Sequence, residues 1–577
     1  MDTFTPSTEP LAGSIALSAL ISLLPLLTFF IMLAVVKAKA HVSGLVSLLV
    51  AILVAIFVFK MPVGMTLMSG VLGAVFGAFP VVWIVIMAIW LYQVTVISGR
   101  FEDLRRVFDV IGGGDVRIQS ILIAFCFGGL LEALAGFGAP VAITATMLLA
   151  LGMAPLRAAA AVLVANTAPV AFGAVAIPIT TAAGLTGLDA NHIGAMVGHQ
   201  APLLAIFVPT LLLFILDGKR GVKEVWPAAL VIGGSFAVAQ FFCATYFSYE
   251  LTDIVASLAG LGAAVIFLRF WTPKGREEAR ARVLVGEAAQ GAAGTGANGA
   301  SQAGSGYDAS DRKLRLGPTF LALFPYLLVI VIFGVAKLWK LGVSIPGALA
   351  ATDVKIKWPM LYGHVLDGEG NPVSSTIYNF QWLSNPGTLL LITGLIVAIV
   401  YSVNDAGGKY KIKVSDAVLE IGRTIYNMRW AATTILSVLA LAYVMNLSGQ
   451  TITIGTWLAG TGAFFAFLSP ILGWLGTAVT GSDTSSNALF AKLQQTAGLN
   501  AGIDPNLLVA ANTSGGVVGK LISPQNLAIA ATAVGMEGKE SVILKKVAGW
   551  SVSMLLVLCV LVYLQSTPIL GWMLPTP

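Results

Sequence analysis

The chain has 577 residues, of which 57% are hydrophobic and only 10% are charged. A soluble globular domain carries about 25% charged residues, so this composition excludes a soluble domain and indicates an integral membrane protein. The formal net charge of +6 is explained by basic loops that face the cytoplasm and anionic lipid, and it requires no nucleic-acid partner.

Apolar spans alternate with basic loops along the first half of the chain. Segment 118–151 differs, because its two apolar pieces are each shorter than the roughly 20 residues that a membrane-spanning helix needs. The pieces flank Glu132 and the sequence GFGAP, so we interpret 118–151 as a re-entrant helical hairpin that enters from the cytoplasm. Segment 156–183 is expected to cross outward as a helix broken near Asn166. The other spans of this half are expected at 14–36, 42–59, 65–98, 195–216, 225–247 and 254–270.

A linker, residues 272–316, separates the two halves. It is basic at both ends and rich in Gly, Ala, Ser and Asn between them. Such a composition cannot bury a core, so we expect a flexible cytoplasmic segment. The linker divides the membrane part into a first repeat, 1–271, and a second repeat, 317–577.

The second half contains the same two kinds of interruption. Segment 337–385 is polar and is expected to form an external loop. Segment 454–497 contains GSDTSSN and is expected to form a second hairpin that approaches from outside. Segment 507–533 contains ANTSGG, whose paired glycines and polar side chains are expected to break the helix that crosses there. The remaining spans are expected at 320–336, 388–403, 430–447 and 547–564.

The interruptions recur in register. The run ANTAPVAFGAVAIP from Ala165 shares its Ala, Asn, Thr, Gly and Pro positions with ANTSGGVVGKLISP from Ala511. Paired Gly/Pro-interrupted segments in two halves mark the binding site of secondary transporters, because the broken helix ends direct free backbone groups at the substrate. The Lys and Arg distribution orients the halves oppositely, so we predict inverted repeats. The alternative is chance similarity between Gly/Ala-rich helices.

Three charged residues within apolar spans carry the prediction of a site. Glu132, Asp483 and Lys520 would each cost at least about 3 kcal/mol at the bilayer centre, which favours a functional role. Burial favours the neutral form of a carboxyl group, so Glu132 and Asp483 are candidate proton carriers. In the alternative interpretation, these two carboxylates form structural ion pairs with Lys520 or with Arg117.

The substrate is expected to be an anion, because helix amino ends present free N–H groups and Lys520 adds a positive charge. Sodium coupling would use the Asn and Thr oxygens instead, and the residues alone do not choose between the two ions. Residues 484–487 equally resemble plain helix-capping residues. The candidate substrate-binding residues are Gly136, Asn166, Thr167, Thr484, Ser485, Ser486, Asn487, Asn512, Thr513, Ser514 and Lys520.

No metal or other cofactor is expected. The three cysteines and four histidines are far apart in sequence and lack metal-ligand spacing. No nucleophile and base are paired, so an integral membrane enzyme is a weak alternative.

Four sequence strings resemble the bacterial lactate permease family. They are FCFGGLLEALAGFGAPVAIT from Phe125, NTAPVAFGAVAIPI from Asn166, GWLGTAVTGSDTSSNALFA from Gly473 and VAANTSGGVVGKLISPQNLAIA from Val509. The shorter strings DGKRGVKEVWPA and GGSFAVAQ extend the likeness through nearly all of the membrane part.

This resemblance implies import of L-lactate, D-lactate or glycolate with protons across the bacterial inner membrane. The paired hairpins are more distantly similar to those of ion-coupled carboxylate transporters that move a transport domain against a scaffold. By that resemblance Glu132, Asn166, Asp483 and Lys520 lie at or near the site. A sodium-coupled carboxylate symporter is the alternative, and the protein is expected to be a monomer or a homodimer.

Overall fold

The computed structural model describes residues 3–36, 38–104, 114–134, 138–284, 316–338, 343–368, 370–406 and 408–575. Within these ranges, eleven helices are long and apolar enough to cross a membrane, or up to twelve if a bent pair counts as one span. The predicted polytopic α-helical membrane protein is therefore confirmed.

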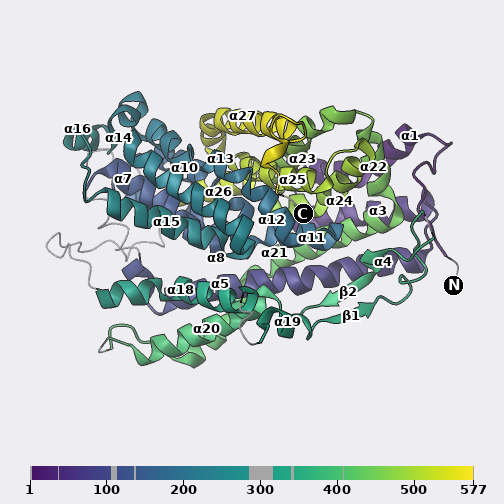
Figure 1. Ribbon diagram of the computed structural model, residues 1–577, viewed down its shortest axis with the longest axis horizontal. Helices are drawn as coiled ribbons and strands as arrows, with labels where there is room; N and C mark the ends of the chain where they lie inside the picture. Colours follow the sequence, from purple (N-terminus) through teal and green to yellow (C-terminus); the bar gives the residue numbers. More distant parts are fainter. Residues whose placement is uncertain are drawn as a thin grey trace.

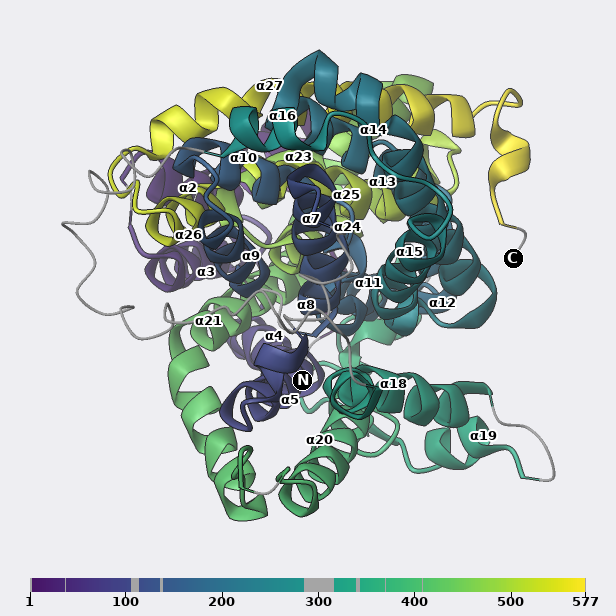
Figure 2. The same cartoon turned by 90° about the vertical axis from the view of Figure 1, so that its left-hand side faces the viewer.

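One layer of the molecule surrounds a 35-residue helix, α21, which contacts most of the layer's other helices. Figures 1 and 2 show α4, α5, α18 and α20 together on the lower side of the molecule. We call this the α21 layer. Its helices are α3 (Ala40–Phe57), α4 (Val63–Phe76), α5 (Trp83–Ile97), α18 (Leu316–Leu338), α20 (Pro386–Val403) and α21 (Val414–Ser448). The sequence analysis expected a span only at 430–447, but the helix is continuous from Val414 to Ser448.

The hairpin layer contains the interrupted segments. In Figure 1 it occupies the upper part of the molecule, with α27 along its top. Its helices are α7 (Val116–Ile121), α8 (Gly128–Leu134), α9 (Ala139–Ala150), α10 (Pro155–Ala165), α11 (Gly173–Thr186), α12 (Ala190–Gly198), α13 (Ala201–Ala205), α14 (Val208–Phe242), α15 (Thr252–Phe267), α16 (Arg276–Val283), α22 (Gln450–Ala459), α23 (Phe465–Thr480), α24 (Asp483–Ala501), α25 (Pro505–Gly519), α26 (Pro524–Ala533) and α27 (Glu540–Gln565). The short helices α1 (Ile15–Ser22) and α2 (Leu24–Ala34) cover its edge.

The first hairpin consists of α7, a π-helical turn (Leu122–Phe127) and α8 as one arm, and α9 as the other. The first arm is continuous over the 19 residues from Val116 to Leu134 and is long enough to cross a membrane, whereas the sequence analysis expected a piece too short to do so. Gly138 ends the tip with a φ of 87°, which a glycine adopts without steric cost. The predicted site residue Gly136 lies outside the described residues.

The first broken helix consists of α10 and α11, which meet at an angle of 59°. Asn166 ends α10, and a 3-10 turn, Val170–Phe172, leads into α11. After Gly173, the three residues Ala174, Val175 and Ala176 have φ values of 45°, 58° and 55°. This left-handed turn is costly for residues with a Cβ atom, so the break is a strongly specified feature.

The second hairpin consists of α23 and α24, with Gly481 at its tip in a left-handed conformation (φ 76°). Its first arm begins at Phe465, not at residue 454 as expected. Residues 450–459 form the separate helix α22, which packs against α1 and α24.

The predicted break at ANTSGG is wrong. Helix α25 continues through Gly515 and Gly516 because these residues let it pack closely on the second hairpin. A Cβ atom on Gly515 would collide with the Pro470 carbonyl of α23. The break lies beyond, at a 3-10 turn (Lys520–Ile522), after which Ser523 caps α26.

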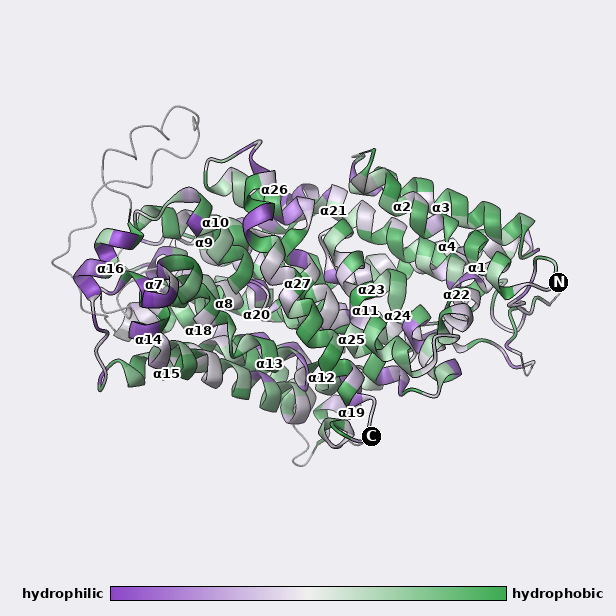
Figure 3. Cartoon of the chain, turned by 90° about the horizontal axis from the view of Figure 1, so that it is seen from above, coloured by the Kyte–Doolittle hydropathy of each residue, from purple (hydrophilic) through white to green (hydrophobic). Residues whose placement is uncertain are grey.

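Among the described residues, a small two-stranded sheet is the exception to the otherwise helical fold. Strands β1 (Val354–Lys357) and β2 (Ile377–Phe380) pair antiparallel in the segment expected to be an external loop. Phe4 pairs with Val365 of the same segment. Figure 1 places β1, β2 and the N-terminus at one end of the molecule and α16, which begins the linker, at the other. Figure 3 shows hydrophilic residues gathered on α7 and α16 at that second end.

Candidate functional site

A buried ion pair joins the two halves of the chain. The Nζ atom of Lys520 donates a hydrogen bond to Glu132 Oε1 at 2.7 Å, and the two side chains are only 8% and 4% exposed. Glu132 lies near the end of α8 at the first hairpin tip, and Lys520 lies at the second helix break. The sequence analysis left open whether Glu132 pairs with Lys520 or with Arg117, and the structure shows the pair with Lys520.

Local structure favours each charge at its position. Lys520 follows the last residue of α25, where the helix dipole stabilises a cation. Gly173, the first residue of α11, lies against the Glu132 carboxyl group, because a Cβ atom there would be 2.9 Å from Glu132 Oε1. The second oxygen, Oε2, has no hydrogen-bond partner among the described residues.

A cavity of about 30 Å³ adjoins this ion pair. A volume of that size holds about one water molecule, so a larger ligand requires the walls to separate. The cavity is bounded by the first hairpin, the first broken helix, the second hairpin tip and the second helix break. Its lining residues are Glu132, Val170, Gly173, Ala174, Pro178, Gly481, Ser482, Asp483, Thr484 and Lys520.

The second hairpin contributes a helix amino end to this cavity. Asp483 is the first residue of α24, and Ser482 caps the helix by accepting a hydrogen bond from the Ser485 N–H at 3.3 Å. Thr477 donates its hydroxyl to Asp483 Oδ1 at 3.4 Å. Asp483 Oδ2 has no partner among the described residues. The amino end of α24 therefore lies at this cavity, beside the Asp483 carboxyl group.

Asn166 and Thr167 lie on the other side of Lys520. Both residues, together with Lys520 and Asn526, border a tightly packed recess between α10, α25 and α26. The Thr167 hydroxyl donates to the Val164 carbonyl at 2.7 Å. The first helix break and the second thus meet at Lys520.

Five of the remaining predicted site residues make side-chain hydrogen bonds away from the cavity: Ser486, Asn487, Asn512, Thr513 and Ser514. Asn512 donates to Asn487 Oδ1 at 2.9 Å, and Asn487 donates to Thr513 Oγ1 at 2.9 Å. Ser514 donates to Gln200 Oε1 at 2.7 Å, and Ser486 donates to the Gly473 carbonyl at 3.0 Å. Buried polar groups need such partners, so these side chains hold α23, α24 and α25 together.

Asp253 is a buried carboxyl group that the sequence analysis missed. It lies in the first turn of α15 and is 1% exposed. The charges of Glu132 and Lys520 act on it. Its sequence context, YELTD, resembles a loop between spans, and only its position next to an apolar helix could have drawn attention to it.

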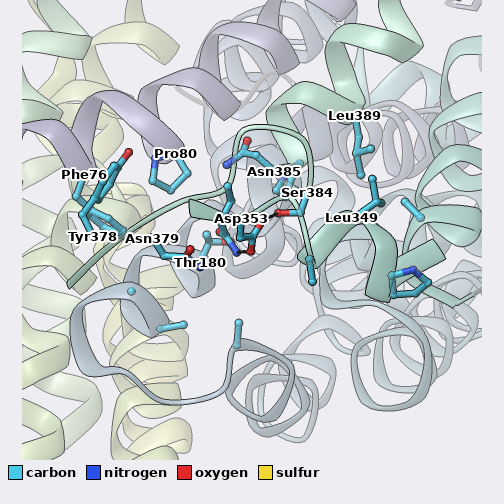
Figure 4. A pocket seen from close by; sticks show the side chains of 18 of the residues that line it. Phe76, Pro80, Thr180, Leu349, Asp353, Tyr378, Asn379, Ser384, Asn385 and Leu389 are labelled. Carbon is cyan, nitrogen blue, oxygen red and sulfur yellow. Dashed lines mark hydrogen bonds between the residues drawn. The ribbon is translucent and has the colours of Figure 1, made fainter. Parts of the chain in front are cut away.

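A second, larger cavity of about 410 Å³ lies between the layers, and we call it the interlayer cavity. Its lining includes Thr180 of α11 and, from the segment that carries β1 and β2, Asp353, Ser384 and Asn385 (Figure 4). Asp353 accepts hydrogen bonds from the Ser384 hydroxyl at 2.5 Å and from the Gln381 amide at 3.2 Å. Tyr249, four residues before Asp253, also lines it.

Arg117 takes part in a different ion network. Its guanidinium is fully buried and contacts Asp115 at 2.9 Å, Asp217 at 3.3 Å and Glu224 at 2.5 Å. Arg282 of α16 completes the network by pairing with Asp217 at 2.8 Å. Pairing of Arg117 with Glu132 or Asp483, the other structural alternative, is therefore wrong, since Arg117 clamps the base of the first hairpin to α14 and α16.

The Arg117 network should dominate the stability of this end of the molecule. Arg117→Met leaves two buried carboxylates, Asp115 and Asp217, and the partly exposed Glu224 without their central cation, so we expect a loss of roughly 3–5 kcal/mol. The measurement is the midpoint of thermal unfolding in detergent. The matched control is Arg423→Met: Arg423 is 74% exposed and pairs with Glu420, so its loss should cost less than about 1 kcal/mol. Equal midpoints for both variants would contradict the clamp.

Comparison with known proteins places these observations in a family. The glycolate permease GlcA of Escherichia coli K12 is 41% identical, with 94% of each chain covered. The L-lactate permease of Bacillus subtilis 168 is 39% identical over 99% of this chain and 100% of its own, and that of E. coli K12 is 41% identical over 98% of each. The solved structure of the Alcanivorax borkumensis YdaH transporter matches with a TM-score of 0.42 and 15% identity, over 85% of this chain and 86% of that chain, a likeness too weak to establish a common fold. The model of the L-lactate permease family matches residues 18–569, and the chain belongs to this family.

Proposed function

We propose that this chain is a secondary active transporter that imports L-lactate, and also D-lactate and glycolate, by proton symport with alternating access. The observation that carries the proposal is the buried Glu132–Lys520 pair, which lies where interrupted helices of both halves meet. The names of the family relatives give the substrate class. The chain is proposed to release its substrate chemically unchanged, and so not to be an enzyme.

The substrate carboxylate and Glu132 compete for Lys520, and this competition couples substrate binding to proton uptake. A substrate carboxylate that binds Lys520 displaces Glu132 from its only described partner. A buried carboxylate without a counter-ion is costly, so Glu132 takes up a proton when the substrate binds. Release reverses both steps, because Lys520 regains Glu132 as the substrate and the proton leave.

The groups around Lys520 suit a small hydroxy acid. The N–H groups at the start of α24 and the hydroxyl of Thr484 lie on one side, and the polar side chains of Asn166 and Thr167 lie on the other. Together they supply donors for a carboxylate and partners for a hydroxyl group. Ser485, Ser486, Asn487, Asn512, Thr513 and Ser514 are proposed to act by fixing the hairpin and α25 in place.

The directions of the helices support inverted repeats, 1–271 and 317–577. Asn487 donates to the Pro178 carbonyl and Gln495 donates to the Thr186 carbonyl, so α11 and α24 run parallel. Helix α25 follows α24 after a short turn and runs back along it. The broken helix 156–183 therefore runs opposite to α25 of the broken helix 507–533, and each is preceded by a hairpin.

The two layers support an elevator-like mechanism. Across the boundary between them, α5 contacts α8 and α11, α21 contacts α24, and α15 contacts α18. We propose that the α21 layer is the scaffold and the hairpin layer moves with the substrate. The interlayer cavity is proposed to open to the outside beneath the loop 337–385, and the linker 272–316 is proposed to be cytoplasmic, in the bacterial inner membrane.

Uptake of labelled L-lactate into proteoliposomes tests the function. We expect faster uptake under an inward proton gradient and no effect of replacing sodium with choline. Equal uptake after an ionophore collapses the gradient would contradict proton coupling, and a sodium requirement would support the sodium-coupled alternative. Recovery of a chemically altered product inside the vesicles would contradict a transporter.

Packing of α25 on the second hairpin gives a test of the site's architecture. A Cβ atom on Gly516 would collide with the Asp483 carboxylate and lie 2.6 Å from Thr477 Oγ1. Gly516→Ala should therefore displace the hairpin tip and lower the initial rate of lactate uptake at least about tenfold, since a core that must be overpacked costs about 1–3 kcal/mol. Gly549→Ala is the matched control, because nothing lies within 4 Å of a Cβ atom there. Wild-type uptake by Gly516→Ala would contradict this packing.

A further inference from the structure

Asp253 is a buried acid in the first turn of α15. It is 1% exposed, and neither of its carboxyl oxygens has a hydrogen-bond partner among the described residues. The neighbouring donor is the amide of Gln240, which also donates to the Ala168 carbonyl at 3.0 Å. An ionised carboxylate in such surroundings is costly, so Asp253 is most stable with a proton bound.

The packing of α8 on α15 places Asp253 opposite Glu132. A Cβ atom on Gly129 would collide with Ser257 Oγ, and one on Gly260 would lie 3.3 Å from Cys126 Sγ. From the first contact to the second, the residue number falls in one helix (Gly129 to Cys126) and rises in the other (Ser257 to Gly260), so the two helices are antiparallel. One turn further on, the same register brings Glu132 to Asp253, in agreement with the electrostatic interaction between them.

Acidic groups continue from Asp253 toward the interlayer cavity. Glu250 lies one helical turn before Asp253, is 2% exposed and accepts the Ser248 hydroxyl at 2.6 Å. Tyr249, next to Glu250, lines the interlayer cavity. The titratable and charged groups around Asp253 on the elements packed against it are Glu132, Lys520, Cys243, Tyr249 and Glu250.

We propose that Glu250 and Asp253 form a proton path that connects the interlayer cavity to Glu132. Asp253 releases its proton from one oxygen to Glu132 and receives another from the Glu250 side, so one proton moves inward and Asp253 ends unchanged. The substrate needs no part of this path, because neither Asp253 nor Glu250 lines the cavity that Lys520 and the α24 amino end border. This inference rests on the proposed proton symport.

Asp253→Asn tests the path, because the amide keeps the size and cannot relay a proton. We expect proton-driven accumulation of lactate to fall at least tenfold and its dependence on external pH to flatten. Exchange of internal for external lactate should stay within about twofold of the wild type, since exchange requires no net proton movement. Glu250→Gln should behave alike, and Asp253→Glu should restore accumulation.

Ser257→Ala is the matched control on the same face of α15, and it should keep wild-type accumulation. Wild-type accumulation and pH dependence in Asp253→Asn would overturn the path while leaving the symport intact. Loss of lactate exchange in both Asp253→Asn and Asp253→Glu would also overturn it, because Asp253 would then support binding or folding. Absence of proton-driven uptake in the wild type would instead overturn the proposed function.

Discussion

Lys520→Met is expected to abolish lactate binding and uptake. The substitution removes the cation proposed to hold the substrate carboxylate and leaves Glu132 buried without a partner. Breaking a buried ion pair costs about 3–5 kcal/mol, so uptake should fall by at least 100-fold. The measurement combines equilibrium binding of labelled lactate to purified protein with uptake into proteoliposomes.

Two further variants separate the role of Lys520 in binding from its role in folding. Lys520→Met combined with Glu132→Gln removes both charges, so it should recover thermal stability without recovering lactate binding. Lys492→Met is the matched control: Lys492 is a half-buried lysine of α24 that donates to Gln495 at 2.7 Å, outside the cavity. Lactate binding by the double variant at wild-type affinity would contradict a contact between Lys520 and substrate.

Glu132→Gln is expected to uncouple transport from protons. Glutamine keeps the volume of the side chain but cannot titrate, and it leaves Lys520 free for the substrate at every pH. Lactate should therefore bind at least as tightly as in the wild type and exchange across the membrane. Proton-driven accumulation should fall at least tenfold, and the pH dependence of uptake should disappear.

The informative measurement for Glu132→Gln is lactate uptake over a series of external pH values, with and without an ionophore. Asn191→Asp offers a control that introduces a carboxylate at an exposed position in the first turn of α12, where the helix dipole stabilises it. It should retain the wild-type pH profile. A wild-type pH profile in Glu132→Gln would refute the proton role of this residue.

The general architecture could be predicted because composition and interruption are local properties. The spans follow from runs of apolar residues, and the breaks at Asn166 and at the GSDTSSN tip follow from Gly, Pro and capping residues. The pairing of Glu132 with Lys520 could be named as an alternative because few charges occur within the spans. These signals need no knowledge of tertiary contacts.

The errors arose where tertiary packing decides. Gly515 and Gly516 were expected to break α25, but their small size serves close helix packing, and the same residue type has both uses. Polarity alone could not separate Thr484, which lines the cavity, from Asn512, which bonds to Asn487. The pairing of β1 with β2 depends on contacts between segments about twenty residues apart, and the sequence analysis recognised no strand there.

The left-handed turn after Gly173 has an energetic consequence for the transport cycle. Each residue with a Cβ atom loses about 1–2 kcal/mol in this conformation, so Ala174, Val175 and Ala176 together store about 3–6 kcal/mol. A ligand with millimolar affinity gains about 4 kcal/mol on binding, which is of the same size. This strained turn therefore follows directly on Gly173, which lies against the Glu132 carboxyl group. The free energy of binding a ligand there would be sufficient to stabilise the strained conformation or to let it relax.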